Sequence, residues 1–291
     1  MFKRVLICTD FTDSLPRLVN FVADLAKGGI EHVVFFHSVP LMTSREIPCV
    51  DEEKVAQARQ MLSVAESNVP EGMTVDIDIA SGRDSENIIR AVTKHNPDII
   101  LSGMATRSEL NERVFGSTTM EIVDKVKVPL MVLRPQLVAT YRESELALRC
   151  QHLFDYLLIP YDGSDSSNNL ISTIKGKLQA EPRYVLETCL LCWVVDDGGR
   201  FADSGAIKAA QAQLNEAKAE LETSSDSNKP TVITEVRIGN PLDEILKSGE
   251  VHDISAIAVC SSKGGGLLRI TPSFTNAILR SSWHPVVHFP S

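Results

Sequence analysis

The stretch RVLICTDFTDS (residues 4–14) decides the fold, because the similar stretch YLLIPYDGSDS (residues 156–166) occurs 152 residues later. Each is an apolar run that ends in an aspartate, Asp10 or Asp162, and continues into residues that favour turns and helix caps. Such a pattern is typical of a buried strand that leads into a helix. The pair indicates an internal duplication.

Later landmarks recur in the same order. Gly82 and Gly239 each precede a helical pattern and lie 157 residues apart. Pro129 and Pro285 each open the last apolar run and lie 156 residues apart. The sequence therefore predicts two copies of one domain. We expect them at residues 1–136 and 153–291, with a linker at 137–152.

Short β-branched runs alternate with segments of helical period in each copy. In the first copy we expect strands at about 3–9, 32–38, 74–80, 98–103 and 129–134, and helices at about 14–27, 51–67, 84–95 and 116–126. Asp51 and Ser85 are the expected caps of two of these helices. Wholly apolar strands that alternate with helices predict an α/β fold with a parallel sheet covered on both faces. Right-handed crossovers then give a doubly wound, five-stranded, Rossmann-like sheet in each copy.

The composition fits two ordinary globular domains, with 43% apolar and 23% charged residues among 291. The net charge of −9 disfavours nucleic acid as a partner. Asp10 interrupts the first apolar stretch too early for a signal-peptide core, and Glu187 interrupts the most apolar later stretch. We therefore expect a cytoplasmic protein without a membrane partner.

The residues that carry chemistry in many enzymes do not assemble into a recognisable set. The sequence has no phosphate loop of the type G-x-x-x-x-G-K-[ST], and its seven histidines are dispersed. Cys189 and Cys192 form a C-x-x-C inside an expected strand, where residues three apart point to opposite faces. We interpret both as buried small side chains rather than as metal or redox groups. We expect no catalytic residues and no metal site.

The loop after the fourth expected strand of the first copy has the composition of an anion site. Ligands of doubly wound sheets bind at the carboxyl ends of the strands. There Gly103 ends a strand, and Gly116-Ser117-Thr118 opens a helix, whose unpaired N–H groups favour an anion. Asp10, at the end of the first strand, can accept hydrogen bonds from ribose hydroxyls. Taken singly, these residues also suit structural roles as a packing glycine, a helix N-cap and a helix cap.

At these residues the chain resembles the universal stress protein family, and the resemblance covers nearly the whole chain twice. Members that bind ATP or AMP share the pattern Gly, two residues, Gly, nine residues, Gly, then Ser or Thr. Gly103, Thr106, Gly116 and Ser117 fall on that spacing. The resemblance implies an adenine nucleotide, ATP or AMP with or without Mg²⁺, and an adenine nucleotide alpha hydrolase-like fold. The implied nucleotide contacts are Asp10, Ser38, Gly103, Gly116, Ser117 and Thr118.

The first copy departs from the family pattern at Thr106, which stands where the second glycine is expected. A positive φ would strain a threonine there. The loop also holds two glutamates, Glu109 and Glu112, that two arginines offset. These departures predict weak binding of a triphosphate or a preference for a monophosphate.

The second copy departs further, because Ser261 and Phe274 replace two of the three glycines. Phe274 is expected to block close approach of a phosphate to the helix start. Glycines and cations remain in the loop, so an anion could still bind. The weak candidates in this copy are Asp162, Lys263, Gly264 and Thr275.

Three functions remain open. The first is a stress-associated regulator that binds ATP or AMP, and the second is an interaction or scaffold protein whose nucleotide sites are eroded. The third is slow ATP hydrolysis, for which no water-activating group is evident. The resemblance also implies that the two copies pair through their last strands, 130–133 and 286–289, and it leaves a homodimer of the whole chain open.

Overall fold

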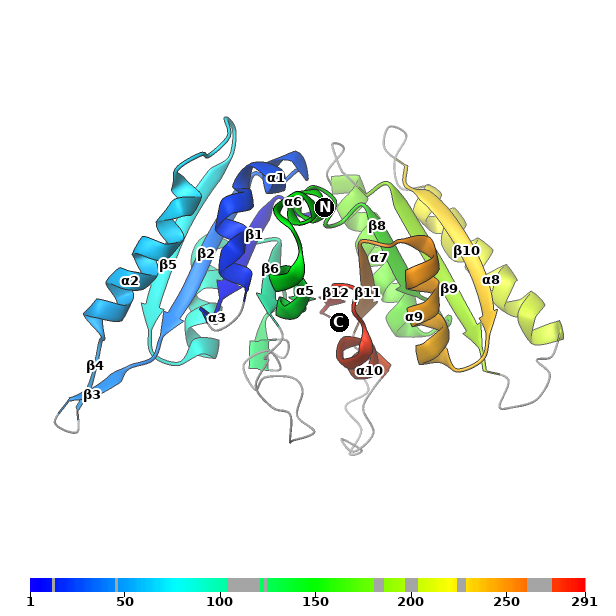
Figure 1. Cartoon of the computed structure of the whole chain (residues 1–291). Coiled ribbons are helices and arrows are strands. Elements are labelled where there is room, and N and C mark those ends of the chain that lie inside the picture. Colours follow the sequence, from blue (N-terminus) through cyan, green and yellow to red (C-terminus); the bar gives the residue numbers. More distant parts are fainter. Residues whose placement is uncertain are drawn as a thin grey trace. The chain divides into compact units, whose positions relative to one another are not determined.

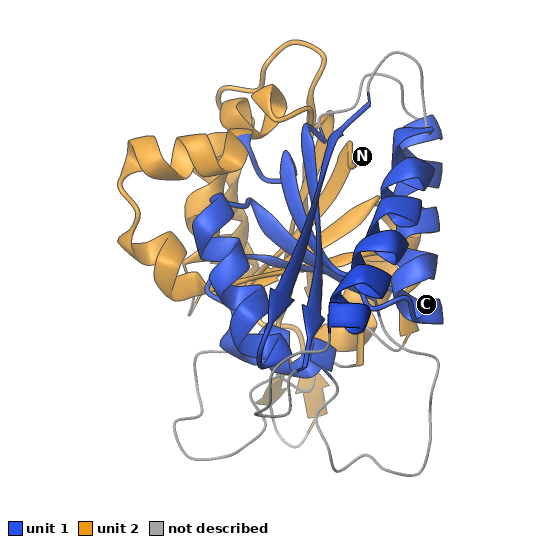
Figure 2. Cartoon of the chain, turned by 90° about the vertical axis from the view of Figure 1, so that its right-hand side faces the viewer, with its two compact units in different colours: residues 1, 152–291 blue, residues 2–151 orange. Residues whose placement is uncertain are grey.

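A computed structural model describes residues 1–11, 14–44, 47–103, 121–122, 125–180, 186–196, 204–223, 229–260 and 274–290. The chain divides into two compact units (Figure 2). The N-terminal unit holds residues 2–151, and the C-terminal unit holds residue 1 with residues 152–291. Each unit contains five parallel strands, so the predicted duplication and the predicted α/β fold are confirmed.

The sheet of the N-terminal unit is built from the apolar runs that the sequence marks as strands. In sheet order the strands are β7 (Leu130–Leu133), β6 (Ile99–Gly103), β1 (Arg4–Thr9), β2 (His32–Val39) and β5 (Thr74–Ser81). All neighbouring pairs run parallel. Leu6, Ile7 and Ile99 are fully buried, as a sheet covered on both faces requires.

Helices cover both faces of this sheet. They are η1 (Leu15–Phe21), α1 (Val22–Lys27), α2 (Glu52–Leu62), η2 (Ser63–Glu66) and α3 (Asp84–His95). Figure 1 shows α1 and α2 on one face and α3 on the other. A hairpin of β3 (Met42–Ser44) and β4 (Ile47–Cys49) follows β2. The hairpin was not predicted, because residues 40–50 have no strand alternation.

The two expected helix caps have different outcomes. Asp51 caps α2 as predicted, since its side chain accepts a hydrogen bond from the Lys54 amide at 3.1 Å. The prediction for Ser85 is wrong, because α3 begins at Asp84 and Arg83 is its N-cap. Gly82 turns the chain directly after β5 with φ at +124°, so the helix begins early and Ser85 already lies in its first turn.

Residues 135–151, which include most of the expected linker at 137–152, form two helices attached to the N-terminal unit. They are α5 (Pro135–Thr140) and α6 (Glu143–Gln151). The Arg17 guanidinium donates to the carbonyl oxygens of Ala139 and Tyr141, both at 3.1 Å. The Gln151 amide donates to Asp24 of α1 at 2.8 Å. These bonds hold both helices on the η1–α1 side of the unit.

The C-terminal unit repeats the strand order. Its strands are β10 (Thr231–Ile238), β9 (Thr188–Val195), β8 (Tyr156–Pro160), β11 (Ala256–Cys260) and β12 (Val286–Phe289). Its helices are α7 (Asp165–Ala180), α8 (Ser204–Glu222), α9 (Pro241–His252) and α10 (Phe274–Ser281). In Figure 1, α9 lies on one face of this sheet, and α7 and α8 lie on the other. β7 and β12 are the last strands of the two units, and their pairing stays a prediction.

Gly239 turns the chain after β10, as Gly82 does after β5, with φ at +138°. The Asn240 side chain then caps α9 by accepting from the amides of Leu242 and Asp243 at 3.0 and 3.2 Å. Of the helices that the structure describes, none is both long and apolar enough to cross a bilayer.

Candidate functional site

Three of the predicted nucleotide contacts lie at the carboxyl edge of the N-terminal sheet. β1 pairs with β2 on one side and with β6 on the other, so the strand order reverses at β1. Thr9, at the end of β1, is in register with His37 of β2. Asp10 follows Thr9, Ser38 follows His37, and Gly103 ends β6. The structure therefore brings these predicted residues to the position where doubly wound sheets bind ligands.

A hydrogen bond ties the ends of β1 and β2 together at this edge. His37 Nδ1 lies 2.8 Å from the Thr9 carbonyl oxygen. Because a carbonyl oxygen only accepts, Nδ1 must carry the hydrogen, and a neutral ring then keeps Nε2 as an acceptor. The Phe11 ring packs against His37 with 4.2 Å between ring centroids. The imidazole is thus held in one tautomer beside Asp10.

Ser38 faces the other side of the sheet from His37, because consecutive strand residues alternate. Its hydroxyl oxygen accepts a hydrogen bond from Asn87 Nδ2 of α3 at 2.9 Å. Asn87 is almost fully buried, and Arg90 donates to its side-chain oxygen. The hydroxyl hydrogen of Ser38 keeps its capacity to donate. Ser38 stays a predicted ligand contact whose orientation is set by Asn87.

The phosphate end of the predicted N-terminal site lies outside the described residues. Gly116, Ser117 and Thr118 belong to it, as does Thr106, the departure from the family pattern. Their predicted roles rest on the sequence alone. The predicted ribose contact, Asp10, is among the described residues, and it is exposed.

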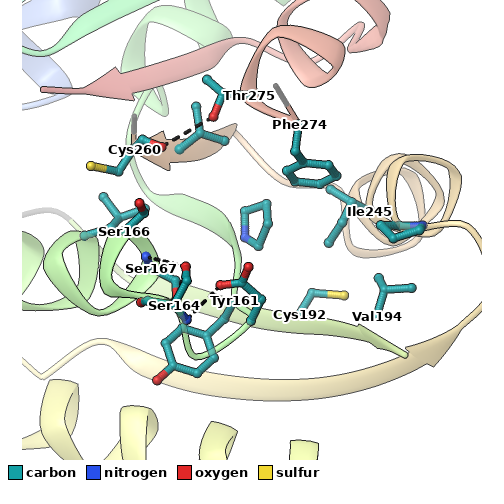
Figure 3. A pocket seen from close by; sticks show the side chains of 15 residues that line it. Tyr161, Ser164, Ser166, Ser167, Cys192, Val194, Ile245, Cys260, Phe274 and Thr275 are labelled. Atoms are coloured by element: carbon teal, nitrogen blue, oxygen red, sulfur yellow. Dashed lines mark hydrogen bonds between the residues drawn. The ribbon is translucent and has the colours of Figure 1, made fainter. Parts of the chain in front are cut away.

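The C-terminal unit contains a cavity of about 490 Å³ at the equivalent edge (Figure 3). It lies at the ends of β8, β9 and β11 and is bordered by the first turns of α7, α9 and α10. Its volume is in the range of small-molecule sites. Apolar side chains form much of its wall, including Leu170, Val194, Ile245, Val259 and Phe274.

Two of the four weak candidates of the second copy line this cavity. Asp162 stands at the end of β8, where its carboxylate accepts a hydrogen bond from the Ser164 amide at 3.0 Å. Loss of solvent would raise the pKa of Asp162, but hydrogen bonds from Ser164 and Ser167 lower it below the ordinary value. The Thr275 hydroxyl donates to the Cys260 carbonyl oxygen at 3.4 Å. Lys263 and Gly264 lie outside the described residues.

Three serines of the cavity wall were not predicted as site residues: Ser164, Ser166 and Ser167. A signal for them existed, because the run GSDSS at 163–167 follows the apolar strand directly. Phe274 was predicted only to obstruct a phosphate. It is the first residue of α10 and forms part of the cavity wall.

The buried cysteines are unreactive thiols. Cys189 and Cys192 are 0% and 1% exposed on β9, as expected for small core side chains. Burial raises the pKa of both thiols, and of the Cys8 thiol, to about 12. Thiolates, the nucleophilic form, are therefore scarce at these positions. Among the described residues no group of His, Cys, Asp and Glu side chains is arranged to hold a metal ion.

Comparison with known proteins identifies the class that this duplicated fold defines. The model of the universal stress protein family matches residues 1–134 and again residues 154–290. The chain belongs to this family, with two copies of its domain.

Individual relatives are distant. A universal stress protein from Archaeoglobus fulgidus has a structure that superposes with a TM-score of 0.64 at 19% identity, covering 99% of this chain and 98% of that one. A putative universal stress protein from Pseudomonas aeruginosa UCBPP-PA14 superposes with a TM-score of 0.58 at 12% identity, covering 99% and 93%. The stress response protein NhaX of Bacillus subtilis is 29% identical over 83 residues, which span 28% of this chain and 46% of NhaX.

Proposed function

We propose that this protein is a stress-associated regulator that binds an adenine nucleotide, ATP or AMP, in its N-terminal unit and catalyses no reaction. The predicted contacts at the nucleoside end are Asp10, Ser38 and Gly103. Those at the phosphate end are Gly116, Ser117 and Thr118. The nucleotide state would alter which surfaces the protein offers to its partners.

The observation that carries the proposal is the gathering of Asp10, Ser38 and Gly103 at the point where the strand order of the N-terminal sheet reverses. These residues fit a nucleoside. The Asp10 carboxylate can accept hydrogen bonds from the two ribose hydroxyls. Gly103 leaves the backbone open to close approach. His37 Nε2 adds an acceptor suited to an exocyclic amine.

The phosphate end is supported by sequence. The sequence predicts a helix start at Gly116-Ser117-Thr118, which offers unpaired N–H groups and two hydroxyls to an anion. Mg²⁺ would accompany ATP through the phosphate oxygens. The substitution of Thr106 for a family glycine favours the smaller phosphate group of AMP.

The absence of turnover is part of the proposal. At the described part of the edge, burial keeps Cys8 as a thiol rather than a nucleophilic thiolate. In this proposal Asp10 recognises ribose hydroxyls and does not activate water. A regulator of this kind responds to nucleotide concentration and need not consume the nucleotide.

Mass spectrometry of small molecules released from freshly purified, denatured protein tests the proposal together with calorimetric titration of ATP, ADP and AMP. We expect binding that Gly116→Val abolishes, because the valine side chain obstructs close approach of a phosphate. Asp162→Asn, which changes the C-terminal counterpart of Asp10, should leave binding unchanged. Absence of released nucleotide and of binding heat would overturn the proposal and favour the scaffold function. Mg²⁺-dependent release of phosphate would instead indicate hydrolysis.

A further inference from the structure

The hairpin β3–β4 concentrates exposed apolar side chains. Met42 of β3 is 43% exposed and Ile47 of β4 is 67% exposed. The flanking residues Leu41 and Val50 are 46% and 43% exposed. Figure 1 shows the hairpin extending beyond the end of β2 and the start of α2. A projecting element with its apolar side chains in water is a candidate for contact with another molecule.

A proline determines which backbone groups of the hairpin point outward. Thr43 and Pro48 lie directly opposite each other. Because proline has no N–H group, this pair cannot be a hydrogen-bonded pair, and the pairs on either side of it carry the hydrogen bonds between the strands. The N–H and C=O groups of Thr43 therefore point away from β4.

Of the two strands, β3 has the outer edge that a further strand can join. Among the described strands β3 pairs with β4 alone, so the outward N–H and C=O groups of Thr43 face no described strand. At the outer edge of β4, Pro48 offers a carbonyl oxygen and no donor. An added strand is therefore expected at β3.

A second copy of this chain fits the edge of β3. In a hydrogen-bonded antiparallel pair the opposite residues exchange both bonds, so Thr43 of each copy can donate to the other across a two-fold axis. Met42, Ile47 and Cys49 share one face of the hairpin. The axis brings these side chains from both copies to one face of a joined sheet. A sheet with two strands from each copy is more stable than an isolated hairpin.

The charge of the hairpin also suits a second copy. The chain carries a net charge of −9, so two copies repel each other overall. Between residues 40 and 50 the charges are those of Arg45 and Glu46, which cancel. Two hairpins therefore meet without like net charges. A segment of this length is shorter than the roughly 20–30 residues that each side of a standard interface contributes, so the dimer should be weak.

We propose that two copies of this chain pair through β3, with Thr43 opposite Thr43, in a weak antiparallel dimer. The proposal goes beyond the proposed function and does not depend on nucleotide binding.

Sedimentation velocity of the full chain, at concentrations on the order of 1 to 200 µM, tests the proposal. We expect the average mass to rise with concentration above the 31.9 kDa of one chain. Thr43→Pro removes the outward N–H and no bond between β3 and β4, and it should weaken the dimer at least about tenfold. Thr43→Val keeps the N–H and should dimerise like the wild type. A wild-type chain that stays monomeric, or a dimer that Thr43→Pro leaves intact, would overturn the proposal.

Disulfide trapping locates the contact and does not depend on whether Thr43→Pro disturbs the hairpin. In a Cys49→Ser background, Thr43→Cys places thiols on directly opposite residues, whose Cα atoms lie about 5.5 Å apart in such a pair and within disulfide reach. Pro48→Cys is the matched control, because its counterpart in the dimer lies three strands away, at about 14 Å. Mild oxidation should give a covalent dimer of the Thr43→Cys chain alone on a non-reducing gel. Cross-linking of Thr43→Cys that does not exceed that of Pro48→Cys would contradict the pairing.

Discussion

The two sheets end differently at equivalent positions. In the N-terminal unit the pair in register at this edge is Thr9 and His37, joined by a 2.8 Å hydrogen bond. In the C-terminal unit, Tyr161 and Trp193 follow the last register pair of β8 and β9, Pro160 and Cys192, and their rings meet edge to face with 5.9 Å between centroids. An aspartate follows the first member of each pair. The two units thus share the strand order and the aspartate. At this edge the N-terminal unit has a polar pair, and the C-terminal unit has an aromatic pair.

The outer strands β5 and β10 have changed less. In the N-terminal unit, Asp78 of β5 accepts from His95 Nε2 of α3 at 2.7 Å. In the C-terminal unit, Glu235 of β10 lies 3.4 Å from His252 Nε2 of α9. These pairs are separated by the same 157 residues as the two glycine turns. The comparison shows that the framework of the fold was retained while the carboxyl edges diverged.

The largest predicted effect tests the attachment of α6, a feature of the N-terminal unit. A Cβ atom at Gly28 would lie 2.8 Å from the carbonyl oxygens of Cys150 and Gln151, which are backbone atoms that cannot move aside alone. Gly28→Ala should therefore lower the free energy of unfolding by about 3 kcal/mol, as overpacking does. Urea denaturation followed by circular dichroism measures the change.

Gly176→Ala in the C-terminal unit is the matched control. Gly176 lies inside α7, and a Cβ there would meet no heavy atom within 4 Å. Alanine favours a helix over glycine by up to about 1 kcal/mol, so this variant should be slightly more stable. Equal effects of the two substitutions would show that α6 is not held as described.

The second prediction concerns the acid–histidine pairs. Loss of solvent would raise the pKa of Asp78, but hydrogen bonds from His95 and Lys94 lower it below the ordinary value. A carboxylate with a lowered pKa stabilises the fold above its unfolded-state pKa and loses this contribution as the pH falls through its folded-state pKa. Asp78→Asn should therefore cost about 2 kcal/mol at pH 7 and flatten the acid limb of the stability curve below about pH 4.

Hydrogen exchange of peptides from β5 measures this effect locally. Glu235→Gln is the counterpart in the C-terminal unit, where the carboxylate also accepts from Arg237 at 2.7 Å and Ser248 at 2.5 Å. Exchange in β10 should rise for this variant while exchange in β5 stays unchanged. A uniform rise in both strands would show that the pairs are not local supports of their own sheets.

The smallest predicted effect lies at two helix ends. α3 and α9 end in residues with positive φ, Asn96 at 46° and Asp253 at 49°. Asparagine and aspartate both tolerate this conformation. The negative charge of aspartate is unfavourable beside the negative end of the helix dipole. Asp253→Asn should stabilise by about 0.5 kcal/mol, and Asn96→Asp should destabilise by a similar amount. A shift of the melting temperature in the same direction for both variants would contradict this prediction.

Much of the fold could be predicted, because it depends on local patterns. Apolar runs with turn residues at their ends identified the strands, and the spacing of Asp10, Gly82 and Pro129 from their counterparts identified the duplication. The hairpin β3–β4 escaped prediction, because its strands have three residues each and no clear alternation. The cap at Ser85 was misplaced, because the turn at Gly82 depends on a backbone angle that the sequence does not specify.

The candidate sites were less predictable, because they depend on which strand ends become neighbours. The sequence placed Asp10, Ser38 and Gly103 on three strands, and the order β6–β1–β2 brings them to one edge. The cavity beside Phe274 was missed, since the residue was considered only as an obstacle to phosphate. Its wall combines residues from β9, α7, α9 and α10, and that combination exists only after folding.

The number of AMP molecules bound per chain tests the central claim most directly. Equilibrium dialysis of the wild-type chain, Gly116→Val and Asp162→Asn with labelled AMP would measure it. The account predicts one AMP per wild-type chain, none for Gly116→Val, and one for Asp162→Asn. Two AMP molecules per wild-type chain, or one that Gly116→Val retains, would contradict the assignment of the nucleotide to the N-terminal unit.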